Sequence, residues 1–289
     1  MTGRVAACIL ALPGPTGQAW RDRLVDAASE QGWDLIVYGG QALVGDLSRT
    51  VLLVSDVDHA RHLGPARWVV LATALGEAAR AAPTVYDLPP EQGLWVVSRL
   101  LATASTLPAV HWLEDSVLGL GTIDILPGLT VAPPRRERLD AIDESFVSAL
   151  RVFEGGPPVP GRSAWWPCDL FGKDAGDRST GDGFWRLDIT GRSRILVFGP
   201  YISLPPGDWQ ARLRFWVDAP AARASWRIEW GDQTGFAFHS FQPGRAGRFE
   251  VRIVHRWETA APAVMRLVLE VPAVDGTLGF EGLHVEQVG

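Results

Sequence analysis

The chain has 289 residues, which is enough for two ordinary domains that each bury a core of their own. Hydrophobic residues make up 47% and charged residues 21%, a balance that is typical of folded protein and excludes a largely disordered chain. The formal net charge of −6 belongs to residues 1–160, with 12 Arg against 18 Asp and Glu, because residues 161–289 carry 15 of each sign. Neither half has the basic excess that phosphate backbones require, so nucleic acid is not an expected partner.

Cysteine and histidine usage points to no metal site and no bound cofactor. The two cysteines, Cys8 and Cys168, lie in different halves of the chain, and the six histidines show no ligand spacing. The apolar start, 1–12, resembles a short signal segment, but Pro13-Gly14 and a helical pattern follow at once. A first buried strand is therefore the better interpretation. No 18 apolar residues run together, so no membrane span is expected, and the sequence leaves the compartment undetermined.

The first 108 residues alternate between apolar runs and helical patterns. Continuous apolar runs indicate four buried strands, at 5–12, 33–38, 51–55 and 67–73. A fifth segment, 84–88, is strand-like. Helical spacing of apolar residues occurs at 19–31, 75–82 and 90–106. Continuous rather than alternating apolar strands favour a parallel sheet covered on both faces. Residues 1–108 therefore predict a Rossmann-like α/β domain.

The loop at 12–18 lies where doubly wound folds hold phosphates, between the first strand and the first helix. Gly14 and Gly17 could cradle a nucleotide there. However, no lysine follows, the three-glycine pattern is absent, and Pro15 removes one amide donor, so a plain turn is favoured. Asp56 and Asp58, after the third strand, could hold a ribose or a metal, but helix capping or solvation is the simpler interpretation.

Residues 109–164 are expected to form a connector with one helix. It contains a strand-like stretch at 122–131 and a helical pattern at 135–153, and a Gly/Pro-rich run at 155–161 marks the domain boundary. The helical pattern places an apolar stripe on one face, formed by Leu139, Ile142, Phe146, Leu150 and Phe153. Together with Trp112, this stripe could contact another protein subunit, or it could pack back on the α/β sheet.

From about residue 165 the period of the pattern changes to two, and eight of the 13 tryptophans lie between Trp165 and Trp257. Short alternating segments separated by Gly, Pro and Asp predict strands at 184–189, 194–198, 209–217, 225–230, 236–241, 248–256, 264–271 and 278–285. This grouping predicts an all-β jelly-roll sandwich over 165–289. The Pro-Pro-Gly-Asp turn at 205–208 is expected to join two consecutive antiparallel strands.

Three stretches of this half carry a resemblance to a known kind of domain. They are Phe-Trp-Arg-Leu-Asp-Ile-Thr-Gly at 184–191, Gly-Pro-Tyr-Ile-Ser-Leu-Pro-Pro-Gly at 199–207 and Leu-Gly-Phe-Glu-Gly at 278–282. Over residues 165–288 the chain resembles the jelly-roll, carbohydrate-binding-module-like domains of bacterial surface-polysaccharide proteins. The resemblance implies a non-catalytic domain that engages glycan. A further association is with the head spikes of phage-like gene transfer particles, which attach to capsular polysaccharide.

Period-two alternation also predicts a candidate sugar site. Trp216 shares a polar strand face with Arg212 and Arg214, and we group Arg227 and Glu229 of the next strand with them. An aromatic plate beside planar charged groups suits the C–H face and the hydroxyls of a sugar. The alternative is that a neighbouring domain or subunit covers Trp216.

Two other groups are weaker candidates. Trp165 and Trp166 are a second possible plate, for which interdomain packing is the plainer interpretation. The Asp-rich loop at 169–182 could ligate calcium, but solvation of the loop is favoured because the spacing fits no EF-hand.

The sequence therefore favours a non-catalytic protein that binds a cell-surface polysaccharide, as a spike or adhesin subunit that also contacts other protein subunits. No catalytic residue is expected, since no pair of carboxyls or activated nucleophile is recognisable. The alternative is a glycosyltransferase-like enzyme of polysaccharide synthesis that holds a nucleotide-sugar at Gly14 and Gly17.

Overall fold

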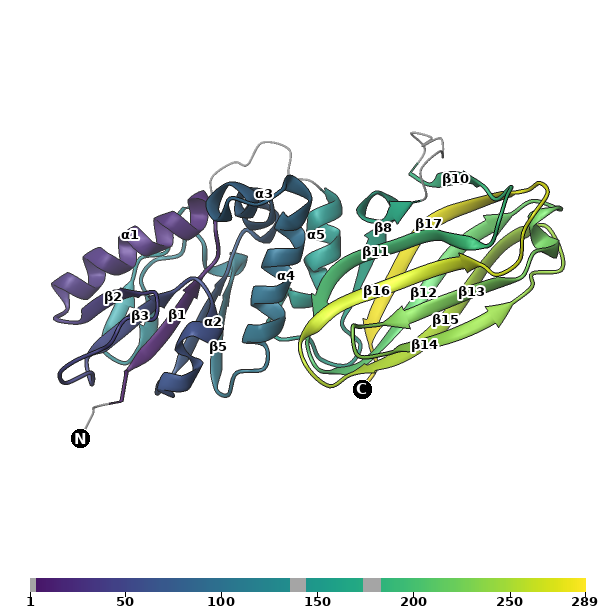
Figure 1. Cartoon of the computed structure of the whole chain (residues 1–289). Coiled ribbons are helices and arrows are strands. Elements are labelled where there is room, and N and C mark those ends of the chain that lie inside the picture. Colours follow the sequence, from purple (N-terminus) through teal and green to yellow (C-terminus); the bar gives the residue numbers. More distant parts are fainter. Residues whose placement is uncertain (1–3, 136–143, 174–182) are drawn as a thin grey trace. The chain divides into compact units, whose positions relative to one another are not determined.

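The computed structural model describes residues 4–135, 144–173 and 183–289, and it divides the chain into two compact units (Figure 1). The first unit comprises Met1–Phe146 with Phe153–Pro157, and the second comprises Val147–Val152 with Pro158–Gly289. The segment 109–164, expected as a connector, is divided between them.

The first unit is built on a five-stranded parallel sheet with the strand order β2-β3-β1-β4-β5. Its strands are β1 (Ala7–Ala11), β2 (Asp34–Tyr38), β3 (Thr50–Val54), β4 (Trp68–Ala72) and β5 (Val110–Glu114). Every residue of β1, β3 and β4 is buried, as continuous apolar runs require in a sheet covered on both faces. The order differs from the 3-2-1-4-5 order of the dinucleotide-binding fold, because β3 rather than β2 lies beside β1. The Rossmann-like expectation thus extends to the parallel α/β layers and not to the strand order.

Helices cover both faces of this sheet. On one face, α1 (Pro15–Glu30) buries Trp20 and Leu24 in a core that it shares with the hairpin of β6 (Ile123–Leu126) and β7 (Leu129–Val131). The other helices are α2 (Val57–Ala60), α3 (Leu75–Tyr86) and α4 (Gly93–Ala104). α4 packs against both α2 and α3.

Two predictions for this unit were wrong. The 33–38 run is the edge strand β2 and is largely accessible, so it is not a buried strand. The 84–88 segment is not a strand, because α3 continues through Pro83 to Tyr86. Pro83 has no N–H to offer the carbonyl of Ala79, and Gly93 packs directly on that carbonyl, where a Cβ would lie 2.0 Å from the oxygen.

The second unit is a sandwich of two antiparallel sheets. One sheet has the order β10-β17-β12-β15, with β8 also pairing with β17, and the other has the order β14-β13-β16-β11-β9. The strands are β8 (Ser163–Pro167), β9 (Gly172–Lys173), β10 (Trp185–Asp188), β11 (Arg194–Leu204), β12 (Gly207–Val217), β13 (Trp226–Gly231), β14 (Phe236–Phe241), β15 (Gly247–Trp257), β16 (Ala261–Leu269) and β17 (Thr277–Gln287). We call them the β12 sheet and the β13 sheet.

The chain moves between the two sheets at almost every step. From β11 to β17, all within the described range 183–289, only β13 and β14 form a hairpin inside one sheet. The turn at 205–208 carries the chain from β11 in the β13 sheet to β12 in the β12 sheet. It therefore does not join paired strands, and the prediction of a simple antiparallel turn is corrected.

Buried indoles fill the space between the sheets, and hydrogen bonds fix several of them. Trp230 donates from Nε1 to the carbonyl of Trp209, 3.0 Å away, and so links the two sheets. Trp226 donates to Ala221 at 3.1 Å, and Trp166 of β8 donates to Ala149 in α5 (Glu144–Leu150) at 3.2 Å. A buried Trp needs such a partner for its N–H, so these bonds fix the packing of the core.

Candidate functional site

Two indoles lie against the outer face of the β12 sheet, each at a glycine of β17. Trp216 of β12 is paired with Gly279, and a Cβ at that glycine would lie 1.7 Å from the Trp216 Nε1. The indole therefore rests directly on the strand backbone, in a place that only glycine leaves open. Trp216 is half-buried, so part of its ring remains accessible.

The second indole is Trp165 of β8. Its partner His284 of β17 is in turn paired with Arg212 of β12, so Trp165 points to the same outer face as Arg212. A Cβ at Gly282 would lie 2.7 Å from Trp165 Cζ2. We call these two half-buried indoles, Trp165 and Trp216, the aromatic platform.

A β-bulge brings the two supporting glycines to the same face. Arg214 pairs with Gly282 and Phe215 pairs with Phe280, so Glu281 is the extra residue of β17. Without the bulge, positions 279 and 282 would point to opposite faces. With it, the glycines are separated by three residues of strand, about 10 Å at most at roughly 3.3 Å per residue.

Polar side chains surround the platform. Arg212 forms an ion pair with Glu286, and Arg214 forms one with Glu250 at 3.3 Å. Burial and the charge of Arg212 lower the pKa of His284, so this imidazole is neutral near pH 7. Among the described residues, His284 Nδ1 and Arg212 Nε are buried atoms without a hydrogen-bond partner.

The structure brings together three of the five residues predicted for the sugar site. Trp216, Arg212 and Arg214 share the outer face of the β12 sheet, whereas Arg227 and Glu229 lie on β13, with their side chains opposite the buried Trp226, Ile228 and Trp230. The latter two are on the outer face of the other sheet, where they form an ion pair at 3.0 Å. They cannot contact the same sugar as Trp216.

The sequence did contain a signal for Trp165. Trp165 and Trp166 are neighbours on a strand, so they must point to opposite faces. The structure buries Trp166 completely against Trp230, with ring centroids 5.9 Å apart, and leaves Trp165 on the outer face. Arg186 of β10, which pairs with Gly279, also lies on this face, with its guanidinium carbon 6.0 Å from the Trp216 ring centroid.

The loop at 12–18, the weaker candidate for a nucleotide site, binds a carboxylate of the chain itself. Glu77 of α3, which is 8% exposed, accepts a hydrogen bond from the backbone N–H of Thr16 at 2.6 Å and another from its hydroxyl at 2.9 Å. A Cβ at Gly14 would lie 2.9 Å from the same carboxylate, and a Cβ at Gly17 would lie 1.8 Å from the Leu12 carbonyl oxygen. The glycines thus serve close packing, and a phosphate at the start of α1 would meet a negative charge.

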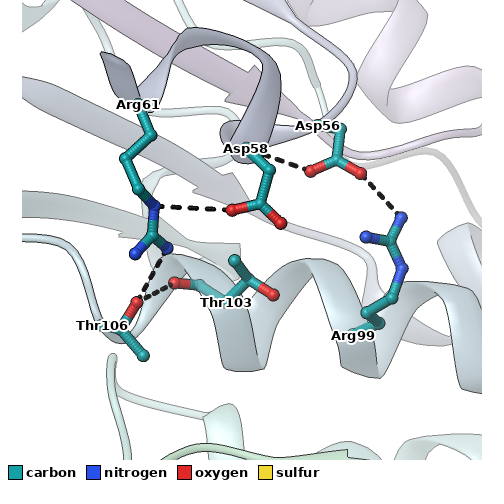
Figure 2. Close-up of polar contacts among 6 residues, drawn as sticks. All are labelled: Asp56, Asp58, Arg61, Arg99, Thr103 and Thr106. Carbon is teal, nitrogen blue, oxygen red and sulfur yellow. Dashed lines mark hydrogen bonds and ion pairs between the residues drawn. The ribbon is translucent and has the colours of Figure 1, made fainter. Parts of the chain in front are cut away.

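Asp56 and Asp58 are engaged in local contacts (Figure 2). Asp56 caps α2 by accepting from the N–H of Asp58 at 3.1 Å, and it forms an ion pair at 2.8 Å with Arg99 of α4. Asp58 pairs with Arg61 at 3.4 Å, and Arg61 also donates to Thr106. These contacts agree with the capping interpretation.

Of the Asp-rich loop at 169–182, for which solvation is favoured over calcium binding, only 169–173 lies within the described residues. Asp174, Asp177 and Asp182 are outside them, as are Leu139 and Ile142 of the predicted apolar stripe. The stripe residues Leu150 and Phe153 are buried. In the described part of the chain, no helix has the length and apolar character needed to cross a membrane.

Comparison with known proteins gives the following. No protein-family profile matches the chain, and neither does any curated protein sequence. The solved structures that resemble it include carbohydrate-binding modules. One is the CBM36-1 domain of a multidomain xylanase from the hindgut metagenome of Trinervitermes trinervoides, with 11% identity and a TM-score of 0.32, covering 44% of this chain and 98% of that one.

A second is TmCBM61 in complex with β-1,4-galactotriose, with 14% identity and a TM-score of 0.30, covering 48% of this chain and 95% of that one. The Gap123 glycosylation-associated protein complex of Streptococcus agalactiae matches along 100% of this chain and 50% of its own, with 8% identity and a TM-score of 0.32. The assignment of the second unit as a β-sandwich follows from its own strand pairing.

Proposed function

We propose that the second unit binds a polysaccharide on the aromatic platform. The observation that carries the proposal is the seating of two half-accessible indoles, Trp165 and Trp216, on Gly282 and Gly279 of a single strand. A flat ring at the surface of a sheet can stack on the C–H face of a sugar, and two rings that rest on glycines no more than about 10 Å apart can contact neighbouring units of one glycan chain.

The surrounding groups support the same proposal. Arg212, Arg214 and Arg186 lie beside the indoles on the same face, and guanidinium groups donate several hydrogen bonds in a fixed plane. Such donors match the vicinal oxygens of a sugar ring. Polar groups of this kind would orient the glycan, while the indoles supply most of the contact area.

The test is retention of the full-length protein on immobilised polysaccharides from a panel of bacterial capsules. We expect Trp216→Ala and Trp165→Ala each to weaken binding about tenfold. If each stacked ring covers about 50 Å² of apolar surface, at about 25 cal/mol per Å² the contact contributes about 1.3 kcal/mol. Phe238→Ala is the matched control, because this aromatic is 69% exposed on the outer face of the other sheet.

Equal retention of both tryptophan variants and wild type would remove the platform from the site. Retention of wild type on no glycan would contradict carbohydrate binding by this unit. Loss of binding by Phe238→Ala alone would move the site to the β13 sheet.

We further propose that the ligand is a capsular polysaccharide and that the protein is displayed as a spike or adhesin subunit of a larger particle, such as a phage-like gene transfer particle. The edge strand β14 supports a contact with other subunits, since its six residues include no Asp, Glu, Lys or Arg that would oppose a pairing partner. Light scattering of the purified protein tests whether copies of the protein assemble through β14. A monodisperse monomer over a wide concentration range would count against assembly through this edge.

The alternative, an enzyme that holds a nucleotide-sugar at Gly14 and Gly17, receives no support from the geometry. Glu77 occupies the amide of Thr16 that a phosphate would need. A thermal-shift measurement with nucleoside diphosphates checks this directly. A ligand at a hundred times its dissociation constant would stabilise the protein by about 2.7 kcal/mol, and we expect no shift.

A further inference from the structure

We propose that the platform selects polysaccharides that carry carboxylate groups, and that Arg186 and Arg214 read this charge beside the two indoles. The inference rests on the proposed function and deepens it by naming the class of glycan. It comes from the way charge is layered on the outer face of the β12 sheet.

On this face three arginines protrude, whereas Arg212, whose side chain is 24% exposed, and the carboxylates lie low. The side chains of Arg214, Arg248 and Arg252 are 51%, 81% and 64% exposed. The carboxylates of this face are less than a third exposed: Glu250 at 28%, Glu281 at 27% and Glu286, the partner of Arg212, at 27%. A ligand that approaches the platform therefore meets guanidinium groups first.

The net charge of this part of the face is also positive. The residues considered are those of three rows of paired residues that run across the strands, together with the bulge residue 281 and the neighbouring residue 286. They include the three carboxylates named above. They also include five arginines, which are Arg186, Arg212, Arg214, Arg248 and Arg252. These five positive and three negative charges leave an excess of +2, which the exposed Asp188, on the same face of β10 as Arg186, lowers to +1, on a protein whose formal net charge is −6. Hydrogen bonds from Arg252 and Arg214 also lower the pKa of Glu250, so this carboxylate stays ionised beneath them.

Two of the arginines adjoin the rings that would stack on the sugar. The guanidinium carbon of Arg214 lies 5.6 Å from the ring centroid of Trp165, and that of Arg186 lies 6.0 Å from the ring centroid of Trp216. A sugar stacked on either indole would bring its substituents within reach of a planar cation. A carboxylate is the substituent that such a group binds best, because two parallel N–H donors match its two oxygens.

The experiment uses the full-length protein and matched pairs of polymers. Polygalacturonate, alginate and uronate-containing capsular polysaccharides are each prepared in native form and with their carboxyl groups reduced to alcohols. Retention on each pair is measured for wild type, Trp216→Ala, Arg186→Gln and Arg214→Gln. Arg227→Gln is the control, since this arginine lies on the other sheet.

We expect at least a tenfold preference for at least one native polymer over its reduced form. Arg186→Gln and Arg214→Gln should each weaken binding to the native form about three- to tenfold and weaken binding to the reduced form clearly less, because only hydrogen bonds to neutral hydroxyls are lost there. Raising the salt from about 50 mM to about 500 mM should erode the preference, because exposed charges are screened.

Three results would overturn the inference, and they have different meanings. Equal binding of native and reduced polymers that is lost in Trp216→Ala refutes selection by charge and leaves the proposed carbohydrate binding intact. No retention of any polymer contradicts the proposed function and the inference together. Competition by single-stranded DNA at equal charge, as strong as that by the native glycan, would show a surface that attracts any polyanion.

Discussion

Replacing Gly279 by alanine should displace Trp216 from the sheet. The new Cβ would lie 1.7 Å from Trp216 Nε1, far inside contact distance, and the strand cannot move because both its neighbours are paired along this stretch. The indole must therefore rotate away. If it gives up about 100 Å² of contact with the sheet, the loss at about 25 cal/mol per Å² is about 2.5 kcal/mol. Alanine in place of a strand glycine returns about 0.5–1 kcal/mol, so the net destabilisation is about 1.5–2 kcal/mol.

The assay is calorimetric unfolding of the full-length protein. The midpoint is read from the unfolding transition of the second unit, which is recognised because variants of the C-terminal half shift it. For a unit of about this size, 1 kcal/mol moves the midpoint by roughly 2–5 °C, so Gly279→Ala should lower it by about 3–10 °C. Gly235→Ala is the matched control, because nothing lies within 4 Å of its Cβ position.

A double-mutant cycle isolates the clash. In a Trp216→Ala background the space at Gly279 is free, and Gly279→Ala should become neutral or slightly stabilising. An equal loss in both backgrounds would refute the reasoning, because the cost would then come from the backbone and not from the indole. Trp216→Ala and Gly279→Ala should also weaken glycan binding to a similar extent, since each removes the indole ring from its position on the sheet.

Three further outcomes are expected. Glu77→Ala should destabilise the N-terminal unit by about 1–3 kcal/mol in denaturant unfolding, since it leaves two part-buried donors of Thr16 without their acceptor, and Glu77→Gln should cost less because it retains an acceptor. Burial raises the pKa of Cys8 to about 12 and also raises that of Cys168, so both thiols should react slowly with a thiol reagent at pH 8 until the protein unfolds, and fast labelling of Cys8 would contradict its burial. Burial lowers the pKa of His284, so the folded protein resists protonation of this imidazole, and its stability should fall as the pH drops below about 6.5, the pKa of histidine in the unfolded chain. The variant His284→Gln should therefore lose less stability than wild type between about pH 7.5 and about pH 5.5. Equal losses would exclude His284 as a cause.

The period-two pattern of the C-terminal half predicted strand faces well, because side-chain direction alternates whatever the partner strand is. It placed Trp226 and Trp230 inward and Arg227 outward, as the burial pattern of β13 shows. It could not assign strands to sheets, since a turn between two strands can close a hairpin or cross the sandwich. That is why Arg227 was grouped with Trp216, although the two lie on opposite outer faces.

The site itself depends on features that the pattern hides. The glycines of β17 have no side chain to count, yet Gly279 and Gly282 make the platform possible, and a glycine inside a strand is the signal of a close approach. The nucleotide alternative illustrates the same limit in the other unit. Glu77 lies 61 residues after Thr16, and only the folded sheet brings its carboxylate to the start of α1.

The crossing of the chain between the two sheets has a consequence for how the sandwich forms. Because neighbouring strands in sequence lie in opposite sheets, the pairs that close each sheet are distant in the chain, as with β11 and β16 or β12 and β17. Neither sheet can assemble from local contacts before the other forms. The chain must first lose the entropy of closing long loops, and most of the stabilising contacts form only afterwards. Folding of this unit should therefore be slow and all-or-none. A truncation that removes β17, the central strand that supports the platform, would leave no part of the sandwich able to fold alone.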